Sequence, residues 1–356
     1  MRKAFFIGFT RGYVAGAHAL INSIIVYHSD LELVLCYDEQ TVPYIESIRP
    51  HLEQSGITSR LIGPCDWSDN KLGRWHVLNE ILDEYDAICL MDADMFVTGR
   101  WDALFDATAY AGLIVGARDQ SNRTYTAHGY SGKDGTPAFD DPMHHQEFCC
   151  SVPLILGKKL RPFMDEWMRC IEDENEHFGD METMNIAMLR AGMLPKLLAF
   201  PTEQFTQVRL TFLSPKMRVI HKGLPENVKM AYPNERREGL LITDGHLRIR
   251  SMHGKYWSDR WVNSMITQMP KHIRNAFSFH VLEKYPDATD EQLEIALKIR
   301  EDMMGKAKVS LKLAVAAFAY MLNARIPFDD ALLKTDEERA HIESHRDYAA
   351  KIFKGL

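Results

Sequence analysis

Short apolar runs alternate with longer helix-like segments over residues 3–62, and this alternation constrains the fold more than any other feature. The short runs predict buried strands, and the longer segments carry apolar residues at helical spacing. A β-α-β-α-β order is typical of a parallel sheet flanked by helices. The predicted strands are Lys3–Ile7, Leu31–Tyr37 and Ser59–Ile62, and the predicted helices are Ala15–Tyr27 and Val42–Gln54.

A fourth apolar run, Ala87–Met91, predicts a fully buried strand, and Asp92-Ala93-Asp94 follows it directly. In an extended chain the two carboxylates would project to the same side, with Ala93 facing away. Like charges held side by side raise each other's pKa unless a cation lies between them. Carboxylate oxygens suit Mg²⁺ or Mn²⁺. For this motif alone, two solvated aspartates in a polar turn remain the alternative.

Two further features suggest anionic ligands. The first strand runs into a loop, Gly8–Tyr13, and nucleotide sites commonly lie at the carboxyl ends of parallel strands. The loop lacks the dinucleotide-binding GxGxxG pattern, so a plain turn is an equal alternative. The predicted helix Asn70–Tyr85 carries Lys71 and Arg74 near its start, where cations are unfavourable for the helix dipole. That placement favours an anionic partner, with a solvated face as the alternative.

The later part of the main region holds a long polar segment and a short basic motif. Asp119–Gln146 is rich in Gly, Ser, Asp, His and Tyr, which is typical of either a functional loop or a disordered one. In His253-Gly254-Lys255, the glycine would let the backbone approach a phosphate closely. For this motif alone, a surface segment without function is the more frequent alternative. Other predicted strands are Ala111–Ala117, Phe148–Leu156 and Arg218–His221, and Leu240–Ile249 is predicted as a strand or hairpin. Other predicted helical segments are Trp101–Phe105, Leu160–Glu174 and Asp180–Ala191.

The composition is that of an ordinary globular protein, with 356 residues, 46% of them apolar and 26% charged. A net charge of −7 gives no basic footprint for nucleic acid, so a nucleic-acid partner is not expected. The six scattered cysteines lack metal-ligand spacing and predict reduced thiols. No apolar run approaches the ~18 residues of a membrane span, and no signal-peptide core is present. A cytoplasmic location is therefore expected.

The pattern changes near residue 261, which predicts a main domain at 1–260 and a helical region at 261–356. The helical region contains Glu291–Met304, the very apolar Val309–Asn323 and the charged Lys334–Lys354. The apolar helix is too short to cross a bilayer. It is expected to be buried or to form a homo-oligomer, with peripheral membrane contact as the lesser alternative.

Several of these pieces resemble the GT-A glycosyltransferases, most closely family 8, the glycogenin and lipopolysaccharide galactosyltransferase relatives. The first strand, its loop and the step Tyr13-Val14-Ala15-Gly16-Ala17 are similar to the opening of that family. Asp92-Ala93-Asp94 resembles its DxD motif. The similarity covers roughly residues 3–257 and also includes Arg74, Asp180-x-Glu182-x-x-Asn185 and His253-Gly254-Lys255-Tyr256-Trp257.

The resemblance implies a GT-A fold, which is a Rossmann-like, mixed but mostly parallel sheet flanked by helices, here with a helical C-terminal extension. It implies a hexosyltransferase that moves a hexose from a nucleotide sugar, with a UDP-sugar favoured, to a glycan, protein or small-molecule acceptor with retention. The implied cofactor is Mn²⁺ or Mg²⁺, held by Asp92, Asp94 and His253. The implied donor-binding residues are Gly8, Phe9, Thr10, Tyr13, Arg74, Asp92, Ala93, Asp94, Gly254 and Lys255, and the implied catalytic carboxylates are Asp180 and Glu182.

Physical chemistry assigns compatible roles to these residues. Negative charge grows on the β-phosphate of the leaving group, where a divalent cation and the charge of Lys255 would stabilise it. Asp180 and Glu182 would hydrogen-bond to sugar hydroxyls and stabilise an oxocarbenium-like transition state. Front-face attack and a covalent intermediate both stay open, with Asp180 as the candidate if a carboxylate takes part.

The chain also departs from the family pattern. Cys149-Cys150-Ser151 stands where an Asn-Ser-Gly or Asn-Ala-Gly step is usual, and Met181 and Glu182 replace a Gln and an Asp. These differences bear on the sugar specificity more than on the metal site. Two alternatives stay open: a nucleotidyltransferase, which would normally show a longer basic glycine-rich loop, and a non-catalytic sugar-binding or scaffolding protein on the same fold.

Overall fold

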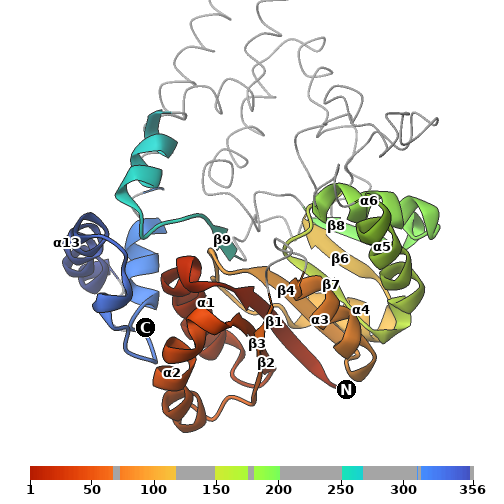
Figure 1. Ribbon diagram of the computed structural model, residues 1–356, viewed down its shortest axis with the longest axis horizontal. Coiled ribbons are helices and arrows are strands. Elements are labelled where there is room, and N and C mark those ends of the chain that lie inside the picture. Colours follow the sequence, from red (N-terminus) through yellow and green to blue (C-terminus); the bar gives the residue numbers. More distant parts are fainter. Residues whose placement is uncertain are drawn as a thin grey trace, which may run out of the picture.

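The structure, a computed structural model, describes residues 1–66, 73–117, 149–174, 180–200, 251–267, 311 and 314–352. The strands of its main sheet are β1 (Lys3–Phe9), β2 (Glu32–Asp38), β3 (Ser59–Cys65), β4 (Ala87–Asp92), β6 (Ile114–Ala117), β7 (Leu154–Leu156) and β8 (Leu197–Phe200). Among the described residues they form one seven-stranded sheet in the order β3-β2-β1-β4-β7-β6-β8 (Figure 1). The β7 strand is antiparallel to β4 and β6, and the other pairs are parallel. This mixed, mostly parallel α/β sheet confirms the predicted fold class.

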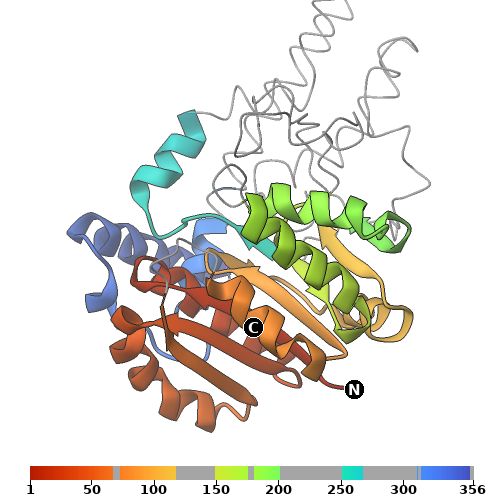
Figure 2. The ribbon, with the colours of Figure 1, turned by 45° about the vertical axis from the view of Figure 1, so that its right-hand side comes forward.

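Helices cover both faces of this sheet. They are α1 (Val14–His28), α2 (Val42–Gln54), α3 (Gly73–Ile81), α4 (Asp102–Ala111), α5 (Arg161–Glu174) and α6 (Asp180–Arg190). A further helix, α13 (Asp336–Ile352), belongs to the C-terminal segment. The helices α1 and α4 share one face, because the Phe5 ring of β1 contacts both His28 and Phe105. On the other face α3 and α5 pack together through Trp75 and Trp167, whose ring centroids are 4.5 Å apart (Figure 2).

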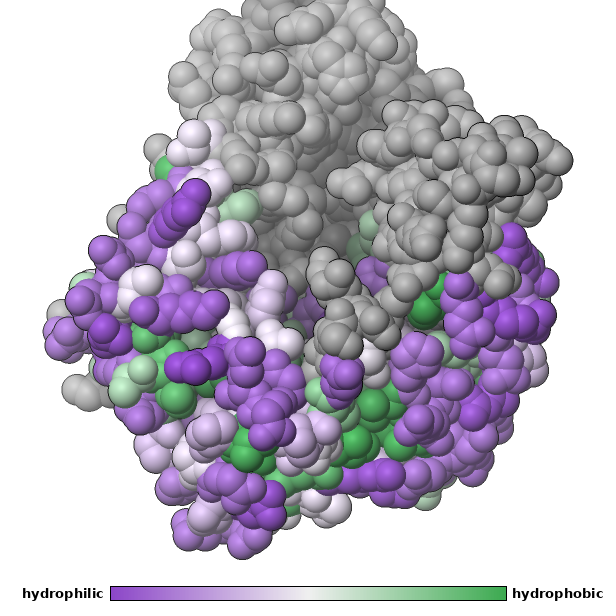
Figure 3. All heavy atoms as spheres, in the orientation of Figure 1, coloured by the Kyte–Doolittle hydropathy of each residue, from purple (hydrophilic) through white to green (hydrophobic). Residues whose placement is uncertain are grey.

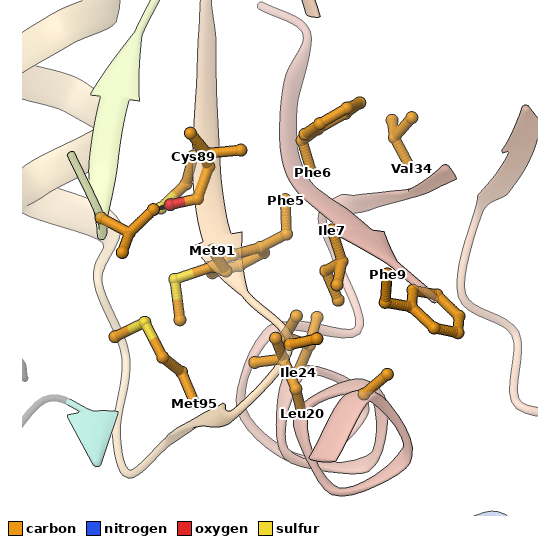
Figure 4. Packing of buried hydrophobic residues seen from close by; sticks show 14 of the residues in the cluster. Phe5, Phe6, Ile7, Phe9, Leu20, Ile24, Val34, Cys89, Met91 and Met95 are labelled. Carbon is orange, nitrogen blue, oxygen red and sulfur yellow. Dashed lines mark hydrogen bonds between the residues drawn. The ribbon is translucent and has the colours of Figure 1, made fainter. Parts of the chain in front are cut away.

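The β1 strand lies at the centre of the core, since all of its residues from Ala4 to Phe9 are buried. Its side chains alternate between the two faces of the sheet. Ile7 points toward Leu20 and Ile24 of α1, whereas Phe6 lies on the opposite side of the strand (Figure 4). Burying each large apolar side chain contributes roughly 1.5–3 kcal/mol to the free energy of folding. Because the β1 side chains are buried on both faces of the sheet, they stabilise the packing of helices on both faces.

Two predicted boundaries near Gly112 are wrong: the end of the helix before it and the start of the strand after it. This residue ends α4 in the left-handed conformation, with a φ of 66°, which glycine adopts without steric cost. The strand predicted over 111–117 therefore begins only at Ile114. The short helical turn predicted over 101–105 continues as the full helix α4, because the chain does not leave the helix before Gly112.

The strand predicted over 148–156 is also shorter than expected, since only β7 pairs within its described part. Pro153 precedes β7 and has no N–H to donate to a ladder, which explains the late start. Three further strands were not predicted: β8 in the main sheet, and β5 (Met95–Val97) with β9 (Ser251–His253), which form a separate antiparallel pair. Each is only three or four residues long, too short to show a period of two.

Several predicted features lie outside the described residues. They are the polar segment Asp119–Gln146, the strands Arg218–His221 and Leu240–Ile249, and the helix Glu291–Met304. The division of the chain at residue 260 stays a prediction.

Buried polar groups fasten the C-terminal segment to α1. Nε2 of His18 lies 2.9 Å from the Ile326 carbonyl, and its Nδ1 lies 3.0 Å from the Tyr44 hydroxyl. Asn22 donates to the carbonyls of Met321 and Ile326, at 2.7 and 2.9 Å, and accepts the Ile326 N–H at 2.8 Å. We call His18, Asn22, Tyr44 and Ile326 the C-terminal clamp.

The apolar C-terminal helix is packed into the same core. Among its described residues, Phe318 contacts the rings of Phe96, Tyr256 and Trp257. Figures 1 and 2 show the C-terminal elements, in blue, lying beside α1. Of the expectations for this helix, burial is confirmed for the residues that the structure describes.

The described surface is mostly hydrophilic in the view of Figure 3. Within the described ranges, the large apolar side chains that are exposed are Met1, Tyr110, Ile266 and Leu332, which do not form a run in the sequence. Nor does any helix in these ranges have the length and apolar character needed to cross a membrane.

Candidate active site

The β5–β9 pair brings two distant motifs together. In its register, Met95 is opposite His253. Directly beside the pair, the Gly254 N–H donates to the Asp94 carbonyl at 2.7 Å. The Asp92-Ala93-Asp94 turn and the His253-Gly254-Lys255 segment are therefore joined by backbone hydrogen bonds, although they lie far apart in the sequence.

The DxD motif lies at the carboxyl edge of the parallel strands. Gly8 at the end of β1 is the ladder partner of Asp92 at the end of β4. Residues 93–94 form a turn and not the extended chain that was expected, yet Ala93 is buried and both aspartates are partly exposed. Phe9 is buried in the core, so only its backbone could contact a ligand. This edge of a sheet is where α/β proteins bind ligands.

Arg74 of α3 joins two of the predicted acidic residues. Its guanidinium donates to the Asp92 carboxylate at 2.6 Å and to the Asp180 carboxylate at 3.0 Å. Burial lowers the pKa of Arg74, but the two carboxylates outweigh this effect, and its pKa is raised above the ordinary value. The remaining donor, Nε, is buried and has no hydrogen-bond partner within the described part of the chain. Arg74 therefore has two carboxylates of the protein as partners, and its Nε–H lacks an acceptor among the described residues. An anionic ligand at this residue stays a prediction.

Ser151 is a site residue that sequence reasoning missed. Its hydroxyl donates to the Asp180 carboxylate at 3.4 Å. Asn185 holds this arrangement, because it donates to the Cys149 carbonyl at 2.8 Å and accepts the Cys149 N–H at 3.1 Å. The departure from the family pattern at residues 149–151 was the one available signal for Ser151. The side chain of Glu182 lies outside the described residues.

The loop after β1 is a short 3-10 turn, in which the Tyr13 N–H donates to the Thr10 carbonyl at 2.9 Å. The Lys255 ammonium lies 4.8 Å from the centre of the Tyr13 ring, a cation–π distance. The Trp257 ring meets the same tyrosine edge-on at 6.3 Å. The loop predicted to bind the donor and the lysine predicted to bind its phosphate are thus neighbours.

Two glycines of these motifs are required by close packing. A Cβ on Gly16 would lie 2.3 Å from the Ala93 carbonyl and 2.7 Å from the Trp257 ring. Gly254 has a φ of 153°, and a Cβ there would lie 2.3 Å from the Trp261 ring. Gly16 thus lets the first helix approach the DxD turn and Trp257, and Gly254 lets its backbone approach the Trp261 ring. The proposed contact of Gly254 with phosphate stays a prediction.

The chemistry of this edge fits a divalent cation. Asp92 and Asp94 supply carboxylate oxygens, and the backbone of His253 is fixed beside them by its pairing with Met95. Within the side chains that the structure describes, no three His, Cys, Asp or Glu residues are grouped as metal ligands, and the His253 side chain is not among them. Binding of Mn²⁺ or Mg²⁺ here remains a proposal.

No family model and no curated protein matches the sequence. Glycosyltransferases of the GT-A fold are among the solved structures similar to this chain. The galactosyltransferase LgtC, solved with donor and acceptor sugar analogues, has a TM-score of 0.49 at 13% identity, over 75% of this chain and 94% of its own. GlyE from Streptococcus pneumoniae has a TM-score of 0.44 at 13% identity, over 74% of this chain and 56% of its own. Mouse xyloside xylosyltransferase 1 has a TM-score of 0.40 at 12% identity, over 72% of this chain and 98% of its own.

Proposed function

We propose that this chain is a metal-dependent glycosyltransferase that moves a hexose from a nucleotide sugar, with a UDP-sugar as first candidate, to an acceptor with retention. The observation that carries the proposal is the pair of ion pairs made by Arg74, which join Asp92 of the DxD motif to Asp180 of the acidic motif. Arg74 and the two motifs that it joins thereby meet at one edge of the sheet, next to the His-Gly-Lys segment.

The unsatisfied Nε of Arg74 supports an acceptor-rich ligand at this edge. A buried N–H without an acceptor costs about 1–3 kcal/mol. A phosphate or sugar oxygen would satisfy it, because both are hydrogen-bond acceptors. The guanidinium would also remain charged at any working pH, since its pKa is raised. The guanidinium could therefore donate to an oxygen of the donor through Nε while it binds the two carboxylates through its other nitrogens.

Each residue then has a distinct task. Asp92 and Asp94 would hold the cation with His253, and a bound cation would supply charge stabilisation for the departing diphosphate. Lys255, held over Tyr13, would bind a phosphate oxygen with a fixed positive charge. Asp180 and Glu182 would accept hydrogen bonds from the sugar hydroxyls.

The hydrogen bonds of Asp180 favour it as the carboxylate closest to the reacting sugar. Arg74 and Ser151 both donate to the same oxygen, Oδ2, at 3.0 and 3.4 Å. Such bonds fix the orientation of the carboxylate, which a group that stabilises an oxocarbenium-like carbon requires. Retention would proceed by front-face attack or through a covalent intermediate on this residue.

A thermal-shift screen of nucleotide sugars with and without Mn²⁺ tests the proposal, because a ligand that binds only the native state raises the melting temperature by mass action. We expect at least one UDP-sugar to stabilise the protein in a Mn²⁺-dependent way and to be hydrolysed slowly. Asp94→Asn should abolish the Mn²⁺-dependent part of the shift, whereas the exposed Asp347→Asn should not change it.

Two outcomes would contradict the proposal. Tight glycan binding without turnover of any nucleotide sugar would favour a non-catalytic sugar-binding protein. A shift that survives intact in Asp94→Asn would refute the assignment of the metal site.

A further inference from the structure

The C-terminal segment places a lysine against the loop that follows β1. A Cβ on Gly12 would lie 3.1 Å from Nζ of Lys334 and 3.9 Å from its Cε. Gly12 has no side chain, so the ammonium group occupies the space that a side chain would otherwise fill. Lys334 belongs to the region that has no counterpart in the resemblance drawn from the sequence.

The backbone of Lys334 is held in place on both sides. Its N–H donates to the Glu338 carboxylate at 2.9 Å, and the preceding Leu333 is buried in the main core. The Leu333 carbonyl accepts a hydrogen bond from Arg339 at 3.0 Å. The lysine thus extends from an anchored point toward the loop.

A second ammonium group, that of Lys255, lies at Tyr13, the residue that follows Gly12. Lys255 is over the ring of Tyr13, and Lys334 is beside Gly12, so the two cations approach consecutive positions of the same loop. Neither ammonium forms a salt bridge to a carboxylate anywhere in the described ranges, even though the chain has a net charge of −7. Like charges that approach one loop repel each other, and an anion bound near both ammonium groups would replace this repulsion with attraction.

We infer that Lys334 is a further donor-binding residue, which pairs with the anionic nucleoside diphosphate of the donor. This inference rests on the proposed function and adds to it a contribution from the C-terminal region. The C-terminal region would then supply a residue of the donor site.

Isothermal titration tests this role with UDP, GDP, ADP and CDP in the presence of Mn²⁺. The wild-type protein is titrated with all four, and the tightest binder is then titrated into Lys334→Met, Lys334→Arg and Lys196→Met. Lys196 is an exposed lysine distant from the loop in sequence and serves as the matched control. A charge-assisted contact that is partly exposed is worth on the order of 1.4 kcal/mol, which corresponds to about tenfold in affinity.

We expect Lys334→Met to weaken binding about tenfold, Lys334→Arg to stay within about threefold, and Lys196→Met to match the wild type. Raising NaCl should weaken binding less in Lys334→Met than in the wild type, because a screened ion pair has been removed. A merely structural role would not change this salt dependence. Equal melting temperatures of the ligand-free variants show that all of them fold.

The possible failures are distinguishable. If the wild type binds a diphosphate and Lys334→Met binds it as tightly as Lys196→Met does, the inference on Lys334 is wrong and the proposed function stands. If the wild type binds none of the four diphosphates, the proposed function itself fails, and the inference fails with it.

Discussion

The C-terminal clamp and the group of Arg74, Asp92, Asp180 and Ser151, which we call the Arg74 cluster, are both built from polar side chains next to the apolar core. They differ in how completely their hydrogen-bonding groups are paired. In the clamp, His18 and Asn22 have all their nearby donors and acceptors paired. Burial lowers the pKa of His18 to about 4, so its ring is neutral near pH 7. A carbonyl can only accept, so Nε2 carries the proton and Nδ1 accepts from the Tyr44 hydroxyl.

The Arg74 cluster is charged and incompletely paired. One guanidinium faces two carboxylates that are partly open to solvent, and its Nε has no acceptor among the described residues. Fully satisfied buried polar groups stabilise one particular packing, whereas unpaired donors in a charged, partly open cluster are typical of ligand sites. A buried polar group alone does not tell a structural site from a ligand site. The two are told apart by whether each donor and acceptor has a hydrogen-bond partner.

The largest effect is expected where the charged cluster is broken. Arg74→Met should lower glycosyl transfer, or slow hydrolysis of the nucleotide sugar, by about a hundredfold or more, because Asp92 and Asp180 lose their common cation. Steady-state kinetics with the donor found by the thermal-shift screen measures this. Arg74→Lys should recover little, since an ammonium lacks the fork that reaches two carboxylates. Activity of Arg74→Met within threefold of the wild type would remove Arg74 from the site.

Breaking the clamp should affect stability and leave the chemistry almost unchanged. Asn22→Ala removes three buried hydrogen bonds to Met321 and Ile326, which should lower the free energy of unfolding by about 2–3 kcal/mol. Urea unfolding measures the loss, and kcat should stay within about threefold. Asn263→Ala, at an exposed asparagine, is the control and should change stability by less than about 0.5 kcal/mol. A large fall in kcat without loss of stability would mean that the clamp belongs to the site.

Acid should weaken the clamp in a defined pH window. The pKa of His18 is about 4 in the folded protein, against 6.5 for an ordinary histidine, so the unfolded chain binds the proton more readily between these values. Stability from this residue is present above pH 6.5 and is lost as the pH falls toward 4. By pH 5 the loss should be about 2 kcal/mol.

His18→Gln can still donate to the Ile326 carbonyl and does not titrate. The difference in unfolding free energy between pH 7 and pH 5 should therefore be smaller by about 2 kcal/mol in this variant. His28, whose pKa burial also lowers to about 4, remains in both proteins and cancels in the comparison. An unchanged difference would show that His18 does not titrate in this window.

The smallest effect is expected from the hydroxyl at the margin of the charged cluster. Ser151→Ala removes a long hydrogen bond to Asp180, which Arg74 continues to hold. Activity should fall about two- to fivefold, which corresponds to a loss of up to about 1 kcal/mol of transition-state stabilisation. A loss as large as that of Arg74→Met would move Ser151 from a supporting position into direct contact with the substrate.

The order of strands and helices was predictable where elements are long and regularly patterned. The first strands and α1 carry apolar residues at fixed spacing, and α2 runs from Val42 to Gln54 as predicted, with Pro50 inside it. β5 and β9 were not predictable, because three-residue strands show no periodicity and exist only through their pairing. Local spacing contains no information about a partner so far along the chain.

The sequence predicted which residues belong to the candidate site better than it predicted which of them contact one another. The sequence singled out Arg74, Asp92 and Asp180, but no spacing indicated that one guanidinium would bind both carboxylates. Ser151 and Lys334 were missed for the same reason: each acts through a tertiary contact, to Asp180 and to the space beside Gly12. Serine and lysine are also common surface residues, so their type alone does not indicate a site.

The clamp also has a consequence for biosynthesis. His18 and Ile326 are 308 positions apart, so α1 leaves the ribosome long before its buried partner is made. At translation rates of about 5–20 residues per second, the interval is roughly 15–60 s. During that time the polar face of α1 lacks its partner carbonyls, and the apolar surface that Phe318 will cover stays open. The nascent chain therefore passes through a prolonged state in which the sheet can form while its first helix is still exposed to chaperones and to other chains.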